Sequence, residues 1–241
     1  MRLKKKKIIV VKKIGILLSM AAIVGMIILS QKAGTYLAEK NKQATETSGK
    51  LQKEDSEKLV VLDSGHGGRD PGKIGVNGTV EKELNLKIAQ KVKHYLEDVG
   101  ISVLMTRTED AGMAESQVED LKARVKLINE EKPLLAVCIH QNSYPEASVF
   151  GTQVFYYAHS KEGEEAARLM QSALQEVELQ KNRDIKANDT YYMLKKTEPP
   201  VLIVECGFLS NPQEEQILND EAYQERLAEG IANGILSYLK I

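Results

Sequence analysis

The chain begins with one long hydrophobic run. Residues 14–30 (IGILLSMAAIVGMIILS) contain no charged side chain, and residues 1–13 before them are rich in Lys. A helix needs about 17 to 25 apolar residues to cross a bilayer, and basic residues flank the cytoplasmic end of such helices. We therefore predict a basic cytoplasmic segment at residues 1–13 and a transmembrane signal anchor at residues 14–30. The rest of the chain would then lie outside the cytoplasm.

A cleaved signal peptide is the alternative for the same run, and it would make the protein secreted. Signal peptides end in a small-x-small cleavage site, whereas Gln31-Lys32-Ala33 follows the run here. The sequence therefore favours an uncleaved anchor. Residues 31–57 are polar and contain little to bury, so we interpret them as a tether between the membrane and a domain at residues 58–241.

From residue 58 onward, short apolar runs alternate with segments of helical periodicity. In residues 81–99, for example, Leu84, Ile88, Val92 and Leu96 recur at the spacing of one helix face. The predicted strands are residues 59–62, 101–106, 134–139, 151–158, 191–194 and 201–204, and the predicted helices are residues 81–99, 118–131, 162–179, 212–218 and 221–240. This alternation predicts an α/β fold, with a mixed, largely parallel sheet and helices on both faces.

Three predicted strands lead into side chains that can bind a metal or move a proton. His66 lies in a glycine-rich loop after the first strand, and His140 and Glu205 directly follow two buried strands. Glu81 stands at the start of the first helix. Ligands bind at the carboxyl ends of strands in α/β sheets. Two imidazoles and a carboxylate, with a fourth position open to water, form a catalytic zinc site, and a further carboxylate can deprotonate that water. We therefore predict His66, Glu81 and His140 as zinc ligands and Glu205 as the general base.

Each of these residues also has a structural interpretation. His66 could make only hydrogen bonds within its loop, and His140 could be a core histidine. Glu81 could be an acid that stabilises the helix N-terminus, with Glu83 as a rival ligand. Glu205 could form a buried salt bridge, because a buried carboxylate without a partner is costly. A zinc-bound water or a substrate would also be such a partner, and a raised pKa would suit a general base.

Asn142, Arg107 and Arg124 are further candidates near this site. Asn142 stands two residues after His140, where it could orient a ligand or the substrate, or cap a turn. Arg107 and Arg124 could pair with buried acids or reach a carboxylate of a substrate. The sequence leaves these alternatives open.

The two cysteines, Cys138 and Cys206, each lie close to a candidate residue. A pair of cysteines outside the cytoplasm suggests a disulfide. However, Cys138 shares the strand face of His140, whereas Cys206 faces opposite Glu205, and a disulfide needs Cα atoms within about 7 Å. We therefore predict two buried free thiols, with thiolate zinc ligation as a minor alternative.

Charge and missing motifs exclude several classes of function. The net charge of -1 is the sum of two unlike parts of the chain. Residues 1–55 are basic, with 12 Lys and Arg against 4 Asp and Glu. The remaining residues are acidic, with 21 Lys and Arg against 30 Asp and Glu. An acidic domain gives no reason to expect nucleic-acid binding. The glycine-rich loop lacks both the GxGxxG and the phosphate-loop spacing, and the chain contains neither HExxH nor GxSxG. Nucleotide-binding, thermolysin-type and serine-hydrolase functions are therefore disfavoured.

Four motifs resemble, in order and spacing, the signature blocks of the zinc-dependent N-acetylmuramoyl-L-alanine amidases, the amidase-3 family. They are LDSGHGGRDPG, GTVEKELNLKIA, CIHQNS and VLIVECGFLSNPQEE, and the resemblance runs from about Lys58 to the C-terminus. It implies an α/β sandwich, one zinc ion on the two histidines and Glu81, and Glu205 as the catalytic carboxylate. Ser64 stands where the family usually has proline, and Cys138 where serine is common. Neither residue is a predicted ligand.

The resemblance implies hydrolysis of the amide between N-acetylmuramic acid and L-alanine of peptidoglycan. A narrower resemblance to germination-specific spore cortex amidases points to cortex remodelling. The segment between His140 and residue 151 is too short for the blocking helix of autoinhibited relatives, so we expect control through an activating partner protein or through expression. A non-catalytic peptidoglycan-binding protein with the same fold is the alternative, and the intact Glu205 argues against it. A zinc carboxypeptidase would share the ligand types but not these motifs.

Overall fold

The computed structural model describes residues 58–177 and 183–241. The predicted cytoplasmic segment, anchor and tether at residues 1–57 lie outside the described residues and stay predictions. Among the helices in the described ranges, none combines the length and the apolar character needed to cross a membrane.

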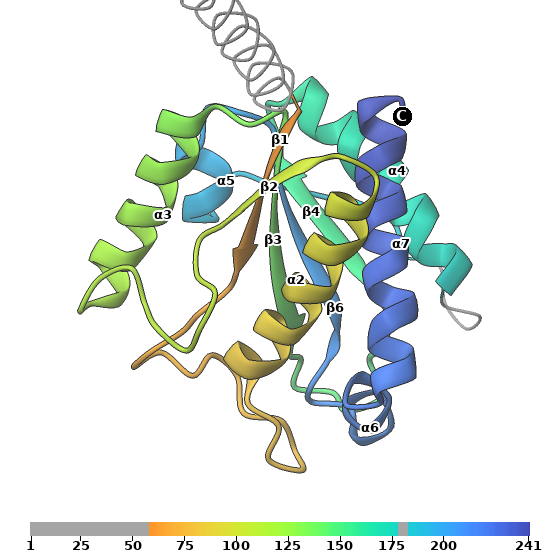
Figure 1. Cartoon of the computed structure of the whole chain (residues 1–241). Coiled ribbons are helices and arrows are strands. Elements are labelled where there is room, and N and C mark those ends of the chain that lie inside the picture. The colour runs from red at the N-terminus through yellow and green to blue at the C-terminus, as the bar shows by residue number, and fades with distance from the viewer. Residues whose placement is uncertain (1–57, 178–182) are drawn as a thin grey trace, which may run out of the picture. The chain divides into compact units, whose positions relative to one another are not determined.

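In the described part of the chain, six strands form one sheet in the order β2-β1-β3-β6-β4-β5 (Figure 1). The strands are β1 (Leu59–Ser64), β2 (Ser102–Met105), β3 (Leu135–Asn142), β4 (Gln153–Tyr157), β5 (Lys186–Asn188) and β6 (Val201–Phe208). β1 pairs in parallel with β2 and β3, and β3 pairs in parallel with β6. β4 runs antiparallel to β6 and carries β5 in parallel at the edge. The sheet is therefore mixed and largely parallel, as predicted.

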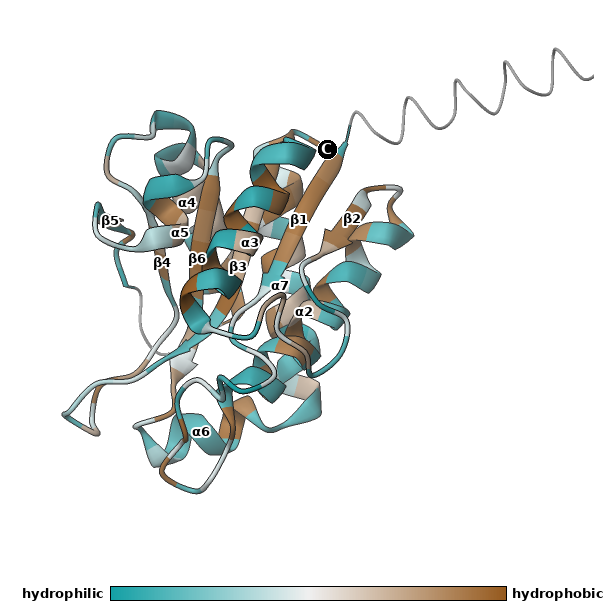
Figure 2. Ribbon diagram, turned by 90° about the vertical axis from the view of Figure 1, so that its left-hand side faces the viewer, coloured by the Kyte–Doolittle hydropathy of each residue, from teal (hydrophilic) through white to brown (hydrophobic). Residues whose placement is uncertain are grey.

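Helices cover both faces of this sheet (Figure 1). α2 (Glu81–Asp98), α4 (Lys161–Val177) and α7 (Glu221–Leu239) pack in one hydrophobic core, and α3 (Gln117–Glu131) and α5 (Tyr192–Lys196) pack in a second core on the other face. α6 (Pro212–Leu218) follows the end of β6. Figure 2 shows hydrophobic strands between helices whose outer surfaces are hydrophilic. Burial of both sheet faces explains why the strands are continuous apolar runs.

Side-chain oxygens fix where several helices begin. Ser116 Oγ accepts a hydrogen bond from the backbone N–H of Glu119 at the start of α3, and Asp220 Oδ1 accepts one from Tyr223 at the start of α7. Such caps satisfy backbone donors that the first helical turn leaves free. The predicted helices agree with α2, α3, α6 and α7 to within one or two residues at each end.

Two predictions about the elements after residue 185 are wrong. Residues 191–194 were predicted as a strand, but α5 begins at Tyr192 with Tyr191 as its N-cap. Asn188 Oδ1 accepts hydrogen bonds from the backbone N–H groups of Thr190 and Tyr191, and the turn that results leads the chain into this helix. Met193 and Leu194 then pack on the sheet from that helix. The edge strand Lys186–Asn188 was not predicted, because it contains no apolar alternation and is held by backbone pairing with β4.

Strand register brings two candidate residues together. Cys138 in β3 and Ile203 in β6 both lie in the α3/α5 core. Successive side chains of a strand alternate between faces, so His140 and Glu205, two residues further along, lie on the same side of the sheet. They are register partners in adjacent parallel strands. β3 continues to Asn142, so His140 lies within the strand rather than after it.

Candidate metal centre

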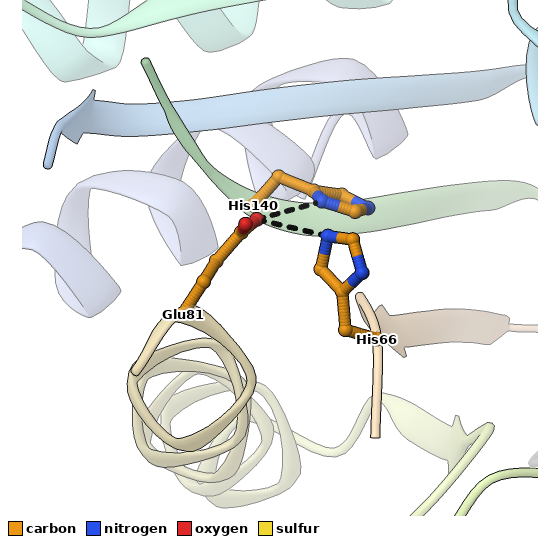
Figure 3. Close-up of side chains that lie close together, drawn as sticks. All are labelled: His66, Glu81 and His140. Atoms are coloured by element: carbon orange, nitrogen blue, oxygen red, sulfur yellow. Dashed lines mark hydrogen bonds and ion pairs between the residues drawn. The ribbon is translucent and has the colours of Figure 1, made fainter. Parts of the chain in front are cut away.

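Three predicted ligands from three elements converge at the carboxyl end of β1 and β3 (Figure 3). His66 follows β1, Glu81 is the first residue of α2, and His140 belongs to β3. Glu81 Oε1 lies 3.2 Å from His66 Nε2 and 3.1 Å from His140 Nδ1. One ligand atom from each residue lies within 4.8 Å of the other two. This is the constellation that the sequence predicts.

The spacing of these atoms fits a tetrahedral zinc ion. Two ligands that each lie about 2.1 Å from such an ion are about 3.4 Å apart. The two printed contacts of Glu81 Oε1, 3.2 and 3.1 Å, are close to that separation. The donor set of two imidazole nitrogens and one carboxylate oxygen also matches known catalytic zinc sites. The three residues therefore fit the metal without rearrangement of the backbone.

The loop that carries His66 has an unusual backbone. His66, Gly67 and Gly68 have φ angles of 64°, 130° and 56°. A positive φ is unfavourable for a non-glycine residue such as His66, and strained conformations of this kind persist only where neighbouring contacts hold them. Two buried arginines supply those contacts through the loop carbonyls.

Arg107 and Arg124 hold successive carbonyls of this loop. Arg107 donates to the carbonyl oxygens of Ser64 and Gly65, at 2.9 and 3.1 Å. Arg124 donates to the carbonyl oxygens of Ser64 and His66, at 2.9 and 2.6 Å. The guanidinium groups of both arginines therefore hold the loop in position. The interpretation in which they reach a substrate carboxylate is not supported by these contacts.

Arg124 also neutralises a buried acid. Its Nη1 lies 2.6 Å from Asp63 Oδ1, and both side chains are about 2% exposed. Burial alone would raise the pKa of Asp63, but the Arg124 charge and the hydrogen bond from Thr106 hold that pKa below its usual range. For Arg124, the pairing with buried acids is therefore the alternative that is observed, whereas Arg107 bonds to backbone carbonyls and makes no ion pair with an acid in the described structure.

We expect Arg124→Met to lower the free energy of unfolding by about 3–5 kcal/mol, because it leaves the Asp63 carboxylate buried without its charge partner. The exposed ion pair between Arg168 and Glu164 on α4 offers a control, since Arg168→Met should cost less than about 1 kcal/mol. Urea unfolding of both variants at pH 7 measures the difference. If both variants lose the same free energy of unfolding, the buried ion pair contributes no more to stability than the exposed one.

A further layer of hydrogen bonds orients the three ligands. Asp70 Oδ2 lies 2.8 Å from His66 Nδ1. A carboxylate can only accept, so Nδ1 carries the proton and Nε2 is left free to bind a metal. Glu81 accepts hydrogen bonds from the backbone N–H groups of Lys73 at 2.7 Å and Gln141 at 3.1 Å. Asp70 is not among the residues predicted from the sequence, although its position four residues after His66 in the same loop was a usable signal.

We expect Asp70→Asn to weaken zinc binding by about 10- to 100-fold, the usual effect of removing a carboxylate that supports a ligand histidine. Asp110→Asn is the matched control. Asp110 accepts a hydrogen bond from the Gly68 N–H in the same loop, but its contacts are with Gly68 and Lys82 rather than with a ligand. Competition against a chromophoric chelator gives both affinities. A similar loss in the two variants would assign the effect to loop stability instead.

Glu205 stands beside this triad with an unsatisfied oxygen. Its Oε2 atom is buried and has no hydrogen-bond partner among the described residues. Burial, together with the negative charge of Glu81 and against the opposing effects of His140 and His66, raises the pKa of Glu205 to about 7. A carboxyl group with this pKa accepts and releases a proton near neutral pH. The salt-bridge interpretation of Glu205 finds no cationic partner in the described structure.

Comparison with known proteins identifies the family. The sequence pattern that defines the N-acetylmuramoyl-L-alanine amidases matches residues 60–237. This chain belongs to that amidase family. A germination-specific N-acetylmuramoyl-L-alanine amidase of Bacillus subtilis is 37% identical over 191 residues, which cover 76% of this chain and 80% of the relative.

Solved structures of amidases agree with this assignment. The CwlD amidase from Clostridioides difficile, solved in complex with the GerS lipoprotein, is 35% identical, and the match covers 76% of this chain and 98% of that one with a TM-score of 0.73. The catalytic domain of CwlV from Bacillus (Paenibacillus) polymyxa var. colistinus is 33% identical, with coverage of 76% and 99% and a TM-score of 0.70.

The electrostatics of this amidase site favour a bound cation. Burial alone would lower the pKa of His66, but hydrogen bonds and charge interactions with Glu81 and Asp70 raise it to about 9. Burial opposes ionisation of Glu81 too, yet the two histidines hold its pKa far below the usual range. A site that stabilises a proton on His66 also stabilises a metal ion in its place, and the two compete.

The remaining candidates of the amidase lie apart from the ligands. Asn142 Oδ1 accepts a hydrogen bond from the backbone N–H of Ser143 at 2.8 Å, which is the turn-capping alternative. Cys138 and Cys206 are buried in the two different cores and form no disulfide. The prediction of two buried cysteines that are not joined by a disulfide is therefore confirmed.

Proposed function

We propose that this chain is a zinc-dependent N-acetylmuramoyl-L-alanine amidase, with His66, Glu81 and His140 as the zinc ligands and Glu205 as the catalytic carboxylate. The family assignment supports the reaction, which is hydrolysis of the amide that joins N-acetylmuramic acid to L-alanine in peptidoglycan. One structural observation supports the residue roles most strongly. A carboxylate with a raised pKa and an unpaired oxygen stands next to a preformed set of zinc ligands.

In this mechanism Glu205 carries the proton. A zinc ion held by His66, Glu81 and His140 would supply a Lewis acid that polarises the scissile carbonyl and lowers the pKa of the attacking water. Glu205 accepts the proton of that water and delivers it to the leaving amine of L-alanine. Arg107 and Arg124 keep the His66 loop in its strained conformation, and Asp70 keeps the His66 imidazole in the required tautomer.

We also propose a setting for this activity. The relative from Bacillus subtilis is germination-specific, which supports a role in spore cortex remodelling. The complex of the Clostridioides difficile neighbour with a lipoprotein supports an activating protein partner for this chain. The charge-free run at residues 14–30 supports attachment to the cell membrane with the catalytic domain outside the cytoplasm. Glycan would lie over the strand-end loops at residues 67–78 and 142–148.

The alternative function is a non-catalytic peptidoglycan-binding protein of the same fold. Such a protein needs no general base, so it has no use for a Glu205 carboxylate whose Oε2 atom is buried and unpaired, which is costly to maintain. Retention of this residue beside the ligands favours the enzyme. A zinc carboxypeptidase is disfavoured by the family match over residues 60–237.

Mass spectrometry of muropeptides tests the proposal. The purified full-length chain is incubated with peptidoglycan and zinc, beside the same sample with a chelator. We expect free peptides that begin with L-alanine, and we expect the chelator to abolish them. Cleavage of another bond, such as the one that releases the terminal D-alanine, would assign a different hydrolase activity.

Glu205→Gln and Glu198→Gln complete the experiment. Glu198 is an exposed glutamate in the loop before β6, so its change should leave peptide release intact. Absence of cleavage by the wild-type chain, with zinc bound and candidate partner proteins added, would favour the binding protein instead.

A further inference from the structure

A cavity adjoins the catalytic carboxylate on the side away from the His66 loop. It has a volume of about 240 Å³ and is bounded by His140 and Glu205 at the metal site. Its other walls are Leu121 of α3, Ile203 of β6, and Tyr191, Tyr192 and Met193 at the start of α5. α3 and α5 lie on the same side of the sheet (Figure 1). The metal site therefore opens into a space between these two helices.

The walls of this cavity are apolar apart from the two site residues. Met193 and Ile203 are buried and form its floor. Leu121, Tyr191 and Tyr192 form its rim, where they are 37%, 40% and 38% exposed. The Tyr191 ring packs against Phe155 at a centroid distance of 5.5 Å, which fixes the rim in place. Three large apolar side chains around a preformed hollow are typical of a ligand site.

The position of Glu205 decides which half of the substrate enters the cavity. Glu205 returns a proton to the leaving nitrogen, so that nitrogen must lie within hydrogen-bond reach of its carboxylate. The carbonyl of the same amide lies toward the three ligands. The cavity begins at Glu205 and His140 and extends away from His66 and Glu81. It therefore receives the peptide, which is the part of the substrate bonded to the amide nitrogen.

The size of the cavity agrees with this assignment. A volume of about 240 Å³ corresponds to roughly eight water molecules at about 30 Å³ each. An alanyl residue has five non-hydrogen atoms, which are bonded to one another and together occupy about the volume of three water molecules, so it fills less than half of the space. The next residue of the peptide would occupy the rest, and the remaining peptide would leave past the tyrosine rim. A bulky first residue would take the space of that second residue and press against Leu121 or Tyr191.

We propose that the cavity between α3 and α5 is the subsite for the leaving peptide, and that Leu121 at its rim determines the preference for a small first residue. This proposal rests on the amidase function proposed above. It assigns a direction to the substrate, with the peptide over the α3/α5 side and the sugar over the opposite loops.

A pair of substrates tests the proposal on the zinc-loaded enzyme. They are N-acetylmuramoyl-L-alanyl-D-isoglutamine and the analogue with L-leucine in place of L-alanine. We expect the wild type to prefer alanine by at least about 100-fold in kcat/KM. We expect Leu121→Ala to reduce this preference at least tenfold by accepting leucine, since a few methylene groups in an apolar pocket change selectivity by this much.

Val118→Ala is the matched control for that variant. Val118 lies one turn earlier on the same helix and is 61% exposed, but it does not line the cavity. Its alanine-to-leucine preference should stay within twofold of the wild type. The proposal is wrong if Leu121→Ala and Val118→Ala give the same preference.

A variant that fills the cavity with a larger side chain, combined with a binding measurement, tests the subsite separately from the amidase function. Leu121→Trp should weaken binding of the product peptide L-alanyl-D-isoglutamine at least tenfold, followed through the NMR signal of the Met193 methyl group. If the wild type binds this peptide at Met193 but cleaves no muramoyl peptide, the subsite stands and the amidase function fails. If the enzyme cleaves the alanine substrate while the peptide leaves the Met193 signal unmoved, the subsite fails and the function stands.

Discussion

Glu205→Gln is expected to lower kcat at least about 1000-fold, within the range attributed to a general acid–base residue, while zinc remains bound. Glutamine has nearly the same shape as glutamate but cannot accept the proton of the attacking water. Glu205 lies beside the three ligands rather than among them, so its replacement leaves the donor set intact. The measurement combines the rate on a muramoyl peptide with the zinc content of the purified variant.

The same substitution should make the metal-free domain more stable. Burial raises the pKa of Glu205 from 4.5 to about 7, so the ionised form is penalised in the folded state. Stability is unaffected by this group below pH 4.5, falls as the pH rises from about 4.5 to 7, and stays lower above pH 7. Glutamine removes the penalty, which is about 3 kcal/mol at most.

Urea unfolding at pH 5 and pH 8, with a chelator present, measures this effect. The gain from Glu205→Gln should be small at pH 5 and large at pH 8. Glu198→Gln should show no such trend, because Glu198 is exposed. If Glu205→Gln abolishes activity without any gain in stability at pH 8, the carboxylate is not held at an energetic cost, and the raised pKa is not the basis of its role.

The sequence could predict that His66, Glu81 and His140 come together because strand periodicity and strand ends are local signals. An apolar strand followed by histidine or glutamate places that side chain at the carboxyl edge of the sheet, as at His140 and Glu205. Residue spacing alone could not show that they are register partners, because pairing between β3 and β6 depends on the order of strands in the sheet.

The supporting contacts could not be predicted from the sequence in the same way. Arg124 in α3 contacts the His66 loop although 58 residues separate it from His66 in the chain. The packing of α3 places the Arg124 guanidinium beside Asp63 rather than in a position to bind a substrate. The cavity beside Glu205 depends on α5, which was predicted as a strand. Local patterns thus identified the chemical groups, and tertiary packing determined what surrounds them.

Gly65→Ala is expected to weaken zinc binding and kcat/KM at least 100-fold each. A Cβ atom added at Gly65 would lie 2.2–2.7 Å from three atoms of the His140 imidazole, far inside van der Waals contact. The glycine cannot move away, because its N–H donates to the Ile139 carbonyl and its own carbonyl accepts from Arg107. The imidazole must therefore rotate out of position, and a catalytic site with three protein ligands loses one of them.

Gly163→Ala is the control for this substitution. Gly163 lies in the first turn of α4, and an added Cβ would meet the Ser160 side chain at 3.0 Å, which a small movement of the hydroxyl can relieve. Its zinc affinity should equal that of the wild type. Thermal unfolding in a chelator distinguishes a displaced ligand from a damaged fold: Gly65→Ala should keep a cooperative transition while losing zinc. Zinc affinity within threefold of the wild type would instead show that His140 has room to move without leaving the site.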